Sequence, residues 1–299
     1  MRKPPALRPG DLIGVVAPGA AVEEAAVRAG VRLLETAGYR VRVGPSVLKQ
    51  AGYLAGSDAD RLADLVAMFA DPEVRAIMAA RGGYGSGRLL PLFDPEIARQ
   101  HPKIFVGYSD LTFLLTALVQ RAELVAFHGP MVGGLDRNHP GAAALLGLLT
   151  GDRAAWNMAA DTIIQPGMAE GVIVGGCLSI LVAALGTPYA LDTAGRLLFI
   201  EDVNEKPYRI DRMLTQLRQA GKLDAVAGVI FGEMAGCTSG PNEAVTVHDV
   251  AREAFASARY PVVFGLSAGH GRGATTLPLG IRARLAGERL VLLDTPVAE

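Results

Sequence analysis

Apolar segments alternate with amphipathic segments along the first half of the chain. Short apolar or alternating runs, bounded by Gly, Pro or polar residues, cover residues 12–17, 39–43, 76–80 and 103–108. Between them, residues 22–37 and 58–69 carry apolar side chains at helical spacing. The short runs predict buried strands, and the helical spacing predicts amphipathic helices. Strands that alternate with helices favour a parallel α/β sheet, whose ligand sites lie beyond the carboxyl ends of its strands.

The pattern changes between residues 150 and 167, where Gly, Pro and polar residues accumulate around Trp156. Beyond this segment we predict helices over residues 178–185 and 210–220, and strands over residues 197–200, 225–231, 262–264, 275–279 and 290–293. We therefore expect an α/β protein in three parts. These are an N-terminal Rossmann/flavodoxin-like parallel-sheet domain over residues 1–149, a linker over 150–167, and a β-rich mixed α/β domain of the swivelling type over 168–299.

Composition excludes several classes of protein. The chain has 299 residues, half of them hydrophobic, so it can bury a core large enough for two domains. Its 29 basic and 30 acidic residues nearly cancel, and no charge excess indicates a nucleic-acid or membrane partner. Two cysteines are too few for a disulfide framework, and no Cys/His spacing resembles a zinc site. The N-terminus lacks the apolar core of a signal peptide, so we expect a soluble cytoplasmic protein.

A strand–turn–helix junction at residues 104–115 is the most informative feature for chemistry. The apolar strand stops at Gly107, Ser109 lies in the turn, and an apolar helix begins at Leu111. Such a junction can present a hydroxyl beside the backbone N–H groups of a helix start, as in a nucleophile elbow. Serine is also a favoured helix N-cap, and on this segment alone capping is the more common explanation.

A glycine-rich loop at residues 81–88 follows the third expected strand. A dinucleotide fingerprint that starts at Gly83 finds Gly85 but fails at Arg88, and no Lys-Ser/Thr pair follows Gly87 as a P-loop requires. The loop can instead bring backbone N–H groups close to a ligand, as an oxyanion hole requires. The alternative is a flexible connection with no ligand role.

A nucleophilic serine needs a base, and histidine is the usual one. We interpret His101, His139 and His248 as solvated, because the first two precede proline in polar turns and the third lies on an expected surface helix. His128 stands near an expected strand end, and His270 is flanked by glycines after the strand at 262–264. The residues alone leave His128 and His270 as equal candidates.

The base needs a carboxylate that fixes its tautomer. Glu201 ends the apolar run over residues 197–200, which places an acid at the carboxyl edge of a strand. Asp202 and Glu205 are close rivals, and Asp110 follows the serine directly. An acid at a strand end is more often solvated or a helix cap than catalytic, so the choice stays open at this point.

Residues 199–214 (FIEDVNEKPYRIDRML) resemble the central signature of the LD-carboxypeptidases, serine peptidases that include muramoyltetrapeptide carboxypeptidase. The family resemblance continues in RGGYG (81–85), GYSD (107–110), GTPY (186–189), GHG (269–271) and TLPLG (276–280). It implies a triad of Ser109 as nucleophile, Glu201 as orienting acid and His270 as base, assembled between the two domains. One departure is Cys177, where relatives commonly have asparagine.

The resemblance implies a cytoplasmic enzyme of peptidoglycan recycling that removes the terminal D-alanine from murein tetrapeptides. It implies no metal or organic cofactor, and it suggests a homodimer. The alternatives are a relative of the microcin-immunity hydrolases, which act on peptidyl or aminoacyl nucleotide antibiotics, and a non-catalytic muropeptide-binding protein.

The mechanism also needs an oxyanion hole and a cation for the free carboxylate of the substrate. We expect the backbone N–H groups of Asp110 and Gly83 to form the oxyanion hole. An arginine suits the carboxylate because its planar fork binds it bidentately. The candidate substrate contacts are Arg81, Tyr84, Arg88 and Arg209.

Overall fold

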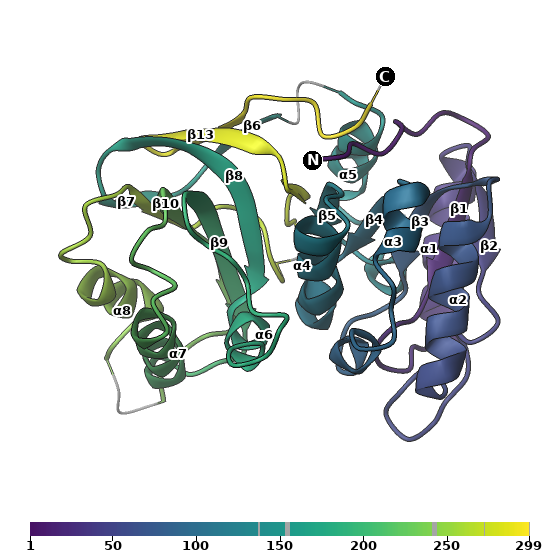
Figure 1. The fold of residues 1–299 in the computed structure, drawn as a ribbon, viewed down its shortest axis with the longest axis horizontal. Coiled ribbons are helices and arrows are strands. Elements are labelled where there is room, and N and C mark those ends of the chain that lie inside the picture. The colour runs from purple at the N-terminus through teal and green to yellow at the C-terminus, as the bar shows by residue number, and fades with distance from the viewer. Residues whose placement is uncertain (137, 153–155, 241–243, 272, 299) are drawn as a thin grey trace.

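The protein folds into two sheets with helices packed around them (Figure 1). The computed structural model describes residues 1–136, 138–152, 156–240, 244–271 and 273–298. Within these residues, one sheet has the strand order β12-β5-β4-β3-β1-β2 and the other has the order β6-β14-β13-β8-β9-β10-β11-β7.

The first sheet and its helices are built mainly from the N-terminal half of the chain. Its elements are β1 (Leu12–Val16), α1 (Glu24–Thr36), β2 (Arg40–Val43), α2 (Asp58–Ala70), β3 (Val74–Ala79), η1 (Ser86–Leu89), α3 (Glu96–Gln100), β4 (Ile104–Gly107), η2 (Ser109–Leu111), α4 (Thr112–Arg121), β5 (Ala126–His128), η3 (Val132–Gly134) and α5 (Ala142–Leu149).

Strands β1 to β5 are all parallel and lie in the order 2-1-3-4-5, which is the flavodoxin-like arrangement. Every residue of β1 is buried, as expected for a parallel strand that helices cover on both faces. The segments after β3 and β4 carry the glycine-rich loop and Ser109. Because β3 and β4 are parallel neighbours, both segments leave the same edge of the sheet.

The second sheet mixes parallel and antiparallel strands. Its elements are β6 (Asn157–Ala159), β7 (Thr162–Gln165), β8 (Met168–Cys177), α6 (Leu178–Ala183), β9 (Arg196–Val203), α7 (Pro207–Gln219), β10 (Gly228–Ala235), α8 (Val247–Ala254), β11 (Val262–Phe264), β13 (Arg282–Ala286) and β14 (Arg289–Leu292). Strands β8 to β11 are parallel, whereas β13, β14, β6 and β7 each pair antiparallel with a neighbour. The predicted two-domain α/β fold, with a parallel N-terminal sheet and a mixed C-terminal sheet, is confirmed.

The two sheets do not divide the sequence as simply as expected. Residues 157–159 and 162–165, within the expected linker, form β6 and β7 and pair with the second sheet. That part of the segment is therefore sheet rather than linker, and residues 153–155 lie outside the described residues. Strand β12 (Leu277–Leu279) returns to the first sheet, where it pairs antiparallel with β5.

The domains pack together where α4 begins and β8 ends. Figure 1 shows α4 beside β8 and α6. The backbone N–H of Cys177 donates to Thr112 Oγ1 at 3.0 Å. A β-carbon on Gly176 would lie 2.6 Å from the same oxygen, so only glycine allows this close approach. The start of α4, which follows Ser109, is thereby fixed against the C-terminal sheet.

Candidate active site

Ser109 occupies a tight turn between β4 and α4. Its φ is +63°, in the left-handed region that non-glycine residues seldom adopt and that costs roughly 1–2 kcal/mol. Ser109 does not cap α4, because the N-cap position is Leu111 and no side-chain cap hydrogen bond is made there. The capping interpretation is therefore wrong, and a strained serine between strand and helix has the form of a nucleophile elbow.

The glycine-rich loop packs directly against this turn. A β-carbon on Gly82 would lie 3.0 Å from Ser109 Cβ and 3.3 Å from the backbone nitrogen of Asp110. Gly82 O accepts a hydrogen bond from Ala20 N at 2.9 Å, and Gly85 O accepts one from the buried Arg61 guanidinium at 3.0 Å. The loop is therefore held in place beside the serine, and the alternative of a flexible connection does not describe it.

His270 and Glu201 form a short hydrogen-bonded pair. His270 Nδ1 lies 2.6 Å from Glu201 Oε2, and Glu201 is fully buried at the end of β9. The imidazole packs edge-on against Tyr108, the residue before Ser109, with 4.8 Å between ring centroids. The structure thus brings the candidate base and the candidate acid beside the turn that carries Ser109.

His128, the other candidate base, faces the same carboxylate. Its Nε2 lies 3.4 Å from Glu201 Oε1. The His128 side chain is 1% exposed, whereas that of His270 is 12% exposed. Since a general base must reach the substrate, the exposure favours His270 as the base.

Two opposing effects act on the Glu201 carboxyl. Burial alone would raise its pKa, but the two neighbouring imidazoles, His128 and His270, outweigh burial and lower the pKa below its ordinary value. Glu201 is therefore ionised at neutral pH. An ionised carboxylate at Nδ1 favours a tautomer in which the other ring nitrogen of His270 can accept a proton.

The rival acids have other partners. Asp202, on the opposite face of β9, accepts from the backbone N–H of Ser179 at 2.8 Å. Glu205 lies 3.4 Å from Arg209. Asp110 is buried and accepts from Ser86 N at 2.8 Å. In the described residues, Glu201 is the carboxylate that hydrogen-bonds His270.

The candidate substrate contacts divide into paired and unpaired groups. Arg88 lies 2.9 Å from Asp58, and Arg209 pairs with Glu205, so nearby carboxylates already balance both charges. Arg81 donates to Ala21 O at 2.9 Å, and it has no carboxylate partner within the described residues. It lines a cavity of about 320 Å³ next to the glycine-rich loop. Of the three arginines, Arg81 is the one whose charge remains available.

Tyr84 forms an exposed aromatic pair with Tyr53. The two rings lie edge-to-face with 5.5 Å between centroids, and they are 53% and 63% exposed respectively. Tyr84 follows Gly82 and Gly83 in the same glycine-rich loop. Tyr53 was not singled out by the sequence, since an isolated tyrosine in a turn carries no motif.

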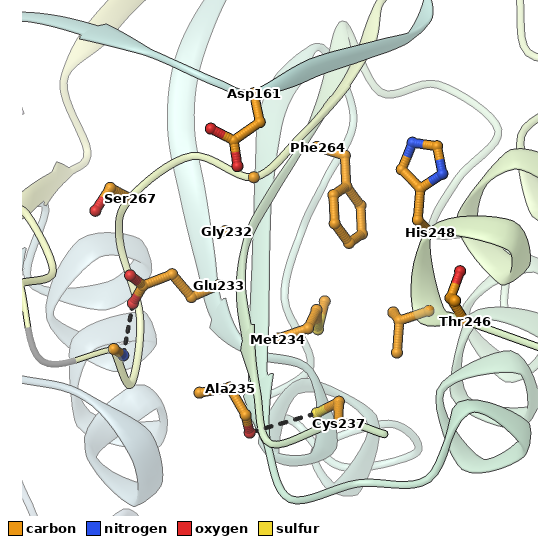
Figure 2. Close-up of a pocket in the computed structure, with 13 residues that line it drawn as sticks. Asp161, Gly232, Glu233, Met234, Ala235, Cys237, Thr246, His248, Phe264 and Ser267 are labelled. Atoms are coloured by element: carbon orange, nitrogen blue, oxygen red, sulfur yellow. Dashed lines mark hydrogen bonds between the residues drawn. The ribbon is translucent and has the colours of Figure 1, made fainter. Parts of the chain in front are cut away.

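Glu233 is a site residue that sequence reasoning missed. Its Oε2 accepts from the backbone N–H of Gly271 at 2.6 Å, which fixes the chain directly after His270 (Figure 2). It also lines a cavity of about 630 Å³, and Figure 2 shows His248 on the opposite side of that cavity. The signal was available, because Glu233, like Glu201, is an acid near the end of an apolar strand.

The remaining candidates have structural surroundings. His101 is exposed, as expected, but His139 and His248 are partly buried. His248 packs edge-on against Phe264 with 5.2 Å between ring centroids, so it is not simply solvated. Burial, followed by the charge of Glu201, raises the pKa of the Cys177 thiol, which lies 3.3 Å from the Ser179 hydroxyl. A buried neutral thiol is a poor nucleophile, which leaves Ser109 as the candidate.

The described residues contain no group of three or more His, Cys, Asp or Glu side chains that could hold a metal ion. They also contain no helix that is both long and apolar enough to cross a membrane.

Comparison with known proteins defines the family. The model of the LD-carboxypeptidase N-terminal domain matches residues 13–129, and that of the LD-carboxypeptidase C-terminal domain matches residues 170–285. A probable murein peptide carboxypeptidase of Bacillus subtilis is 41% identical over 99% of this chain and 96% of its own length. The chain belongs to the LD-carboxypeptidase family, as its motifs predicted.

Solved structures share the fold over almost the whole chain. The muramoyltetrapeptide carboxypeptidase of Oxalobacter formigenes has a TM-score of 0.86 and 28% identity, and the match covers 96% of this chain and 100% of that one. The microcin C7 self-immunity protein MccF, in complex with aspartyl sulfamoyl adenosine, has a TM-score of 0.91 at 22% identity, with 100% of both chains covered. The second likeness shows the fold alone.

Proposed function

We propose that this protein is a serine LD-carboxypeptidase that removes the terminal D-alanine from murein tetrapeptides and acts in peptidoglycan recycling. The observation that carries the proposal is the 2.6 Å pair of His270 and Glu201, whose imidazole packs edge-on against Tyr108, the residue that precedes a left-handed Ser109. The family supports the reaction class, and the names of the Bacillus and Oxalobacter relatives support a murein peptide as substrate.

In the proposed mechanism Ser109 Oγ attacks the carbonyl of the scissile amide and His270 takes its proton. His270 then donates that proton to the departing D-alanine amine, and water hydrolyses the acyl-enzyme by the same steps. Glu201 holds the imidazole through Nδ1 and stabilises its cation. The backbone N–H groups of Asp110 and Gly83 bind the oxyanion; loss of one such donor typically costs on the order of 10²–10³ in turnover.

We assign the free carboxylate of the substrate to Arg81. A carboxypeptidase must recognise the terminal carboxylate beside the bond that it cleaves, and an unpaired guanidinium is the natural ligand. Arg81 directly precedes Gly82, on which a β-carbon would lie 3.0 Å from Ser109 Cβ, and it carries no carboxylate partner in the described part of the chain. Replacement by alanine should raise KM far more than it lowers kcat.

The decisive experiment is digestion of a defined murein tetrapeptide, followed by mass spectrometry. Wild-type protein should release one D-alanine, and Ser109→Ala should lose at least on the order of 10³ in kcat. Ser257→Ala, an exposed serine on the same chain, is the matched control and should keep full turnover. Full turnover by Ser109→Ala would overturn the nucleophile, and tight binding of the peptide without cleavage would support a non-catalytic binding protein.

A second candidate function is hydrolysis of an aminoacyl nucleotide antibiotic. The exposed Tyr53–Tyr84 pair beside the loop favours it, because aromatic faces can stack on a nucleobase. The same assay with an aminoacyl sulfamoyl adenylate distinguishes the two. Cleavage of this compound by a protein that leaves the tetrapeptide intact would replace the murein proposal.

We also propose a cytoplasmic homodimer. Light scattering coupled to size exclusion would measure its mass, and fractionation of cells would locate it. A monomer at the assay concentration would overturn the homodimer, and recovery outside the cytoplasm would overturn the location. Neither result would change the proposed reaction.

A further inference from the structure

His128 and Glu201 each bury a polar atom for which the described residues show no hydrogen-bond partner. His128 Nε2 and Glu201 Oε1 lie 3.4 Å apart, and each is completely shielded from solvent. Each is thus a polar partner within reach of the other. A buried carboxylate oxygen without a hydrogen-bond donor lowers the stability of the fold, typically by about 1–3 kcal/mol and by more for a charged group.

The protonation state of His128 follows from this geometry. A carboxylate oxygen can only accept a hydrogen bond, so the proton between the two atoms must belong to the histidine. We propose that His128 carries a proton on Nε2 and acts as a positioning residue, donating to Glu201 Oε1 so that Oε2 stays aimed at His270 Nδ1. This inference rests on the proposed function for its catalytic consequence, but the tautomer of His128 can be measured without it.

The surroundings of His128 make it a rigid donor. It ends β5, where it pairs with Gly107 of β4 on one side and with Leu277 of β12 on the other. Its ring lies edge-on to Phe199 and Tyr108, with centroids 5.1 and 5.8 Å away. Because its backbone is paired on both sides and its ring packs against two others, His128 has little freedom to move away from the Glu201 carboxylate.

This contact also links the two domains. His128 and Ser109 lie at the carboxyl ends of β5 and β4 in the first sheet, whereas Glu201 lies on β9 of the second sheet and His270 in the loop that follows β11. The acid is therefore attached to the domain that carries the nucleophile, through a residue on the strand next to β4. If His128 sets the position of Glu201, it also sets the distance between the base and Ser109.

The experiment compares His128→Gln with His128→Leu. Glutamine can still offer an N–H to Glu201, whereas leucine leaves Oε1 without a donor. We expect His128→Leu to lower kcat about ten- to a hundredfold with KM little changed, as for other residues that orient a catalytic side chain. His128→Gln should recover a large part of that loss. His101→Gln, an exposed histidine, is the control and should match the wild type.

A pH profile separates positioning from simple structural damage. Without the donor, Glu201 becomes more basic and binds the imidazolium of His270 more tightly, so the acid limb of kcat/KM should move to higher pH. His128→Gln should reverse most of this shift. The ionisable groups around Glu201 are His128, His270, Tyr108, Cys177, Asp202 and Cys237, with Glu233 across Gly269.

Nuclear magnetic resonance of protein with ¹⁵N-labelled histidine supplies the test that is independent of activity. We expect His128 to show a protonated Nε2 that exchanges slowly with solvent, and His128→Leu to shift the downfield Nδ1–H signal of His270. An unprotonated Nε2 on His128 overturns the inference, as does unchanged turnover and pH profile in His128→Leu. If the wild type shows the expected tautomer but cleaves no murein peptide, the proposed function fails while the assignment of the proton stands.

Discussion

Ser86 and Asp110 are joined by two hydrogen bonds that fasten the glycine-rich loop to the turn of the candidate nucleophile. Ser86 N donates to Asp110 Oδ2 at 2.8 Å, and Ser86 Oγ donates to Asp110 O at 2.6 Å. Both residues are buried. The loop that carries Gly83 and the backbone N–H of Asp110 thus form one rigid unit, which an oxyanion hole requires.

Loss of the Asp110 carboxylate should loosen this unit. Asp110→Ala leaves the buried Ser86 N–H without an acceptor, which costs about 1–3 kcal/mol in the free energy of unfolding. Asp110→Asn keeps an acceptor oxygen and should cost less. Both substitutions also remove the Asp110 carboxyl, whose pKa is raised, chiefly by burial. Urea unfolding and kcat on the peptide check both effects, with the exposed Asp211→Ala as control. An unchanged stability of Asp110→Ala would contradict the role given to this contact.

A β-carbon on Gly82 should obstruct the reaction. It would meet Ser109 Cβ at 3.0 Å, Tyr108 O at 3.2 Å and Asp110 N at 3.3 Å, so it would crowd both the nucleophile and an oxyanion donor. We expect Gly82→Ala to lower kcat by roughly the loss of one oxyanion donor, on the order of 10²-fold. Gly134→Ala is the matched control, since its β-carbon would meet nothing within 4 Å. Equal kcat values for the two variants would argue against crowding at the site.

Lys103 should make stability depend on alkaline pH. It is 5% exposed, its ammonium donates to Asp71 O, and burial lowers its pKa to about 8. Between pH 8 and the ordinary lysine value of about 10.4, the unfolded chain binds a proton that the folded chain does not. The contribution of Lys103 to stability therefore rises with pH across that window.

Urea unfolding from pH 7 to 10.5 measures this contribution as a difference between variants. Lys103→Met should show a shallower rise of stability with pH than the wild type. Lys206→Met is the control, because Lys206 is exposed and also donates to a backbone carbonyl, Thr238 O at 3.3 Å. Parallel stability curves for the wild type and Lys103→Met would show that burial does not lower the pKa of Lys103.

Local patterns predicted the elements that a single apolar run or helical face defines. The helix expected over residues 58–69 is α2, Asp58–Ala70, and the strand expected over residues 262–264 is β11. Strand β8 was missed because Gly171, Gly175 and Gly176 interrupt its alternation. Glycine is required at these positions because other segments approach the backbone closely, as Thr112 approaches Gly176. A single sequence does not reveal such contacts.

The site was predictable where chemistry restricts the choice and ambiguous where packing decides. Residue type and turn alone brought Ser109 forward, but they left His128 and His270 equal. Both histidines reach Glu201, His128 from the end of β5 and His270 from the loop that follows β11, so no local pattern could separate them. Strand β12 illustrates the same limit: in sequence it lies between β11 and β13 of the second sheet, yet it pairs with β5 beside His128. Non-local strand pairing carries no signature in the segments themselves.

The left-handed backbone of Ser109 predicts that the nucleophile position trades stability for function. Both Ser109→Ala and Ser109→Gly remove the hydroxyl, but only glycine relieves the strain of a φ of +63°. The relief is partly offset by the greater freedom of glycine in the unfolded chain, so Ser109→Gly should be more stable than Ser109→Ala by about 0.5–1 kcal/mol. Urea unfolding of the two inactive variants measures the difference directly. At Ser257, which is exposed and has no left-handed φ, the order should reverse, with the glycine variant the less stable. If glycine is also the less stable choice at position 109, the turn is not strained and the elbow needs another explanation.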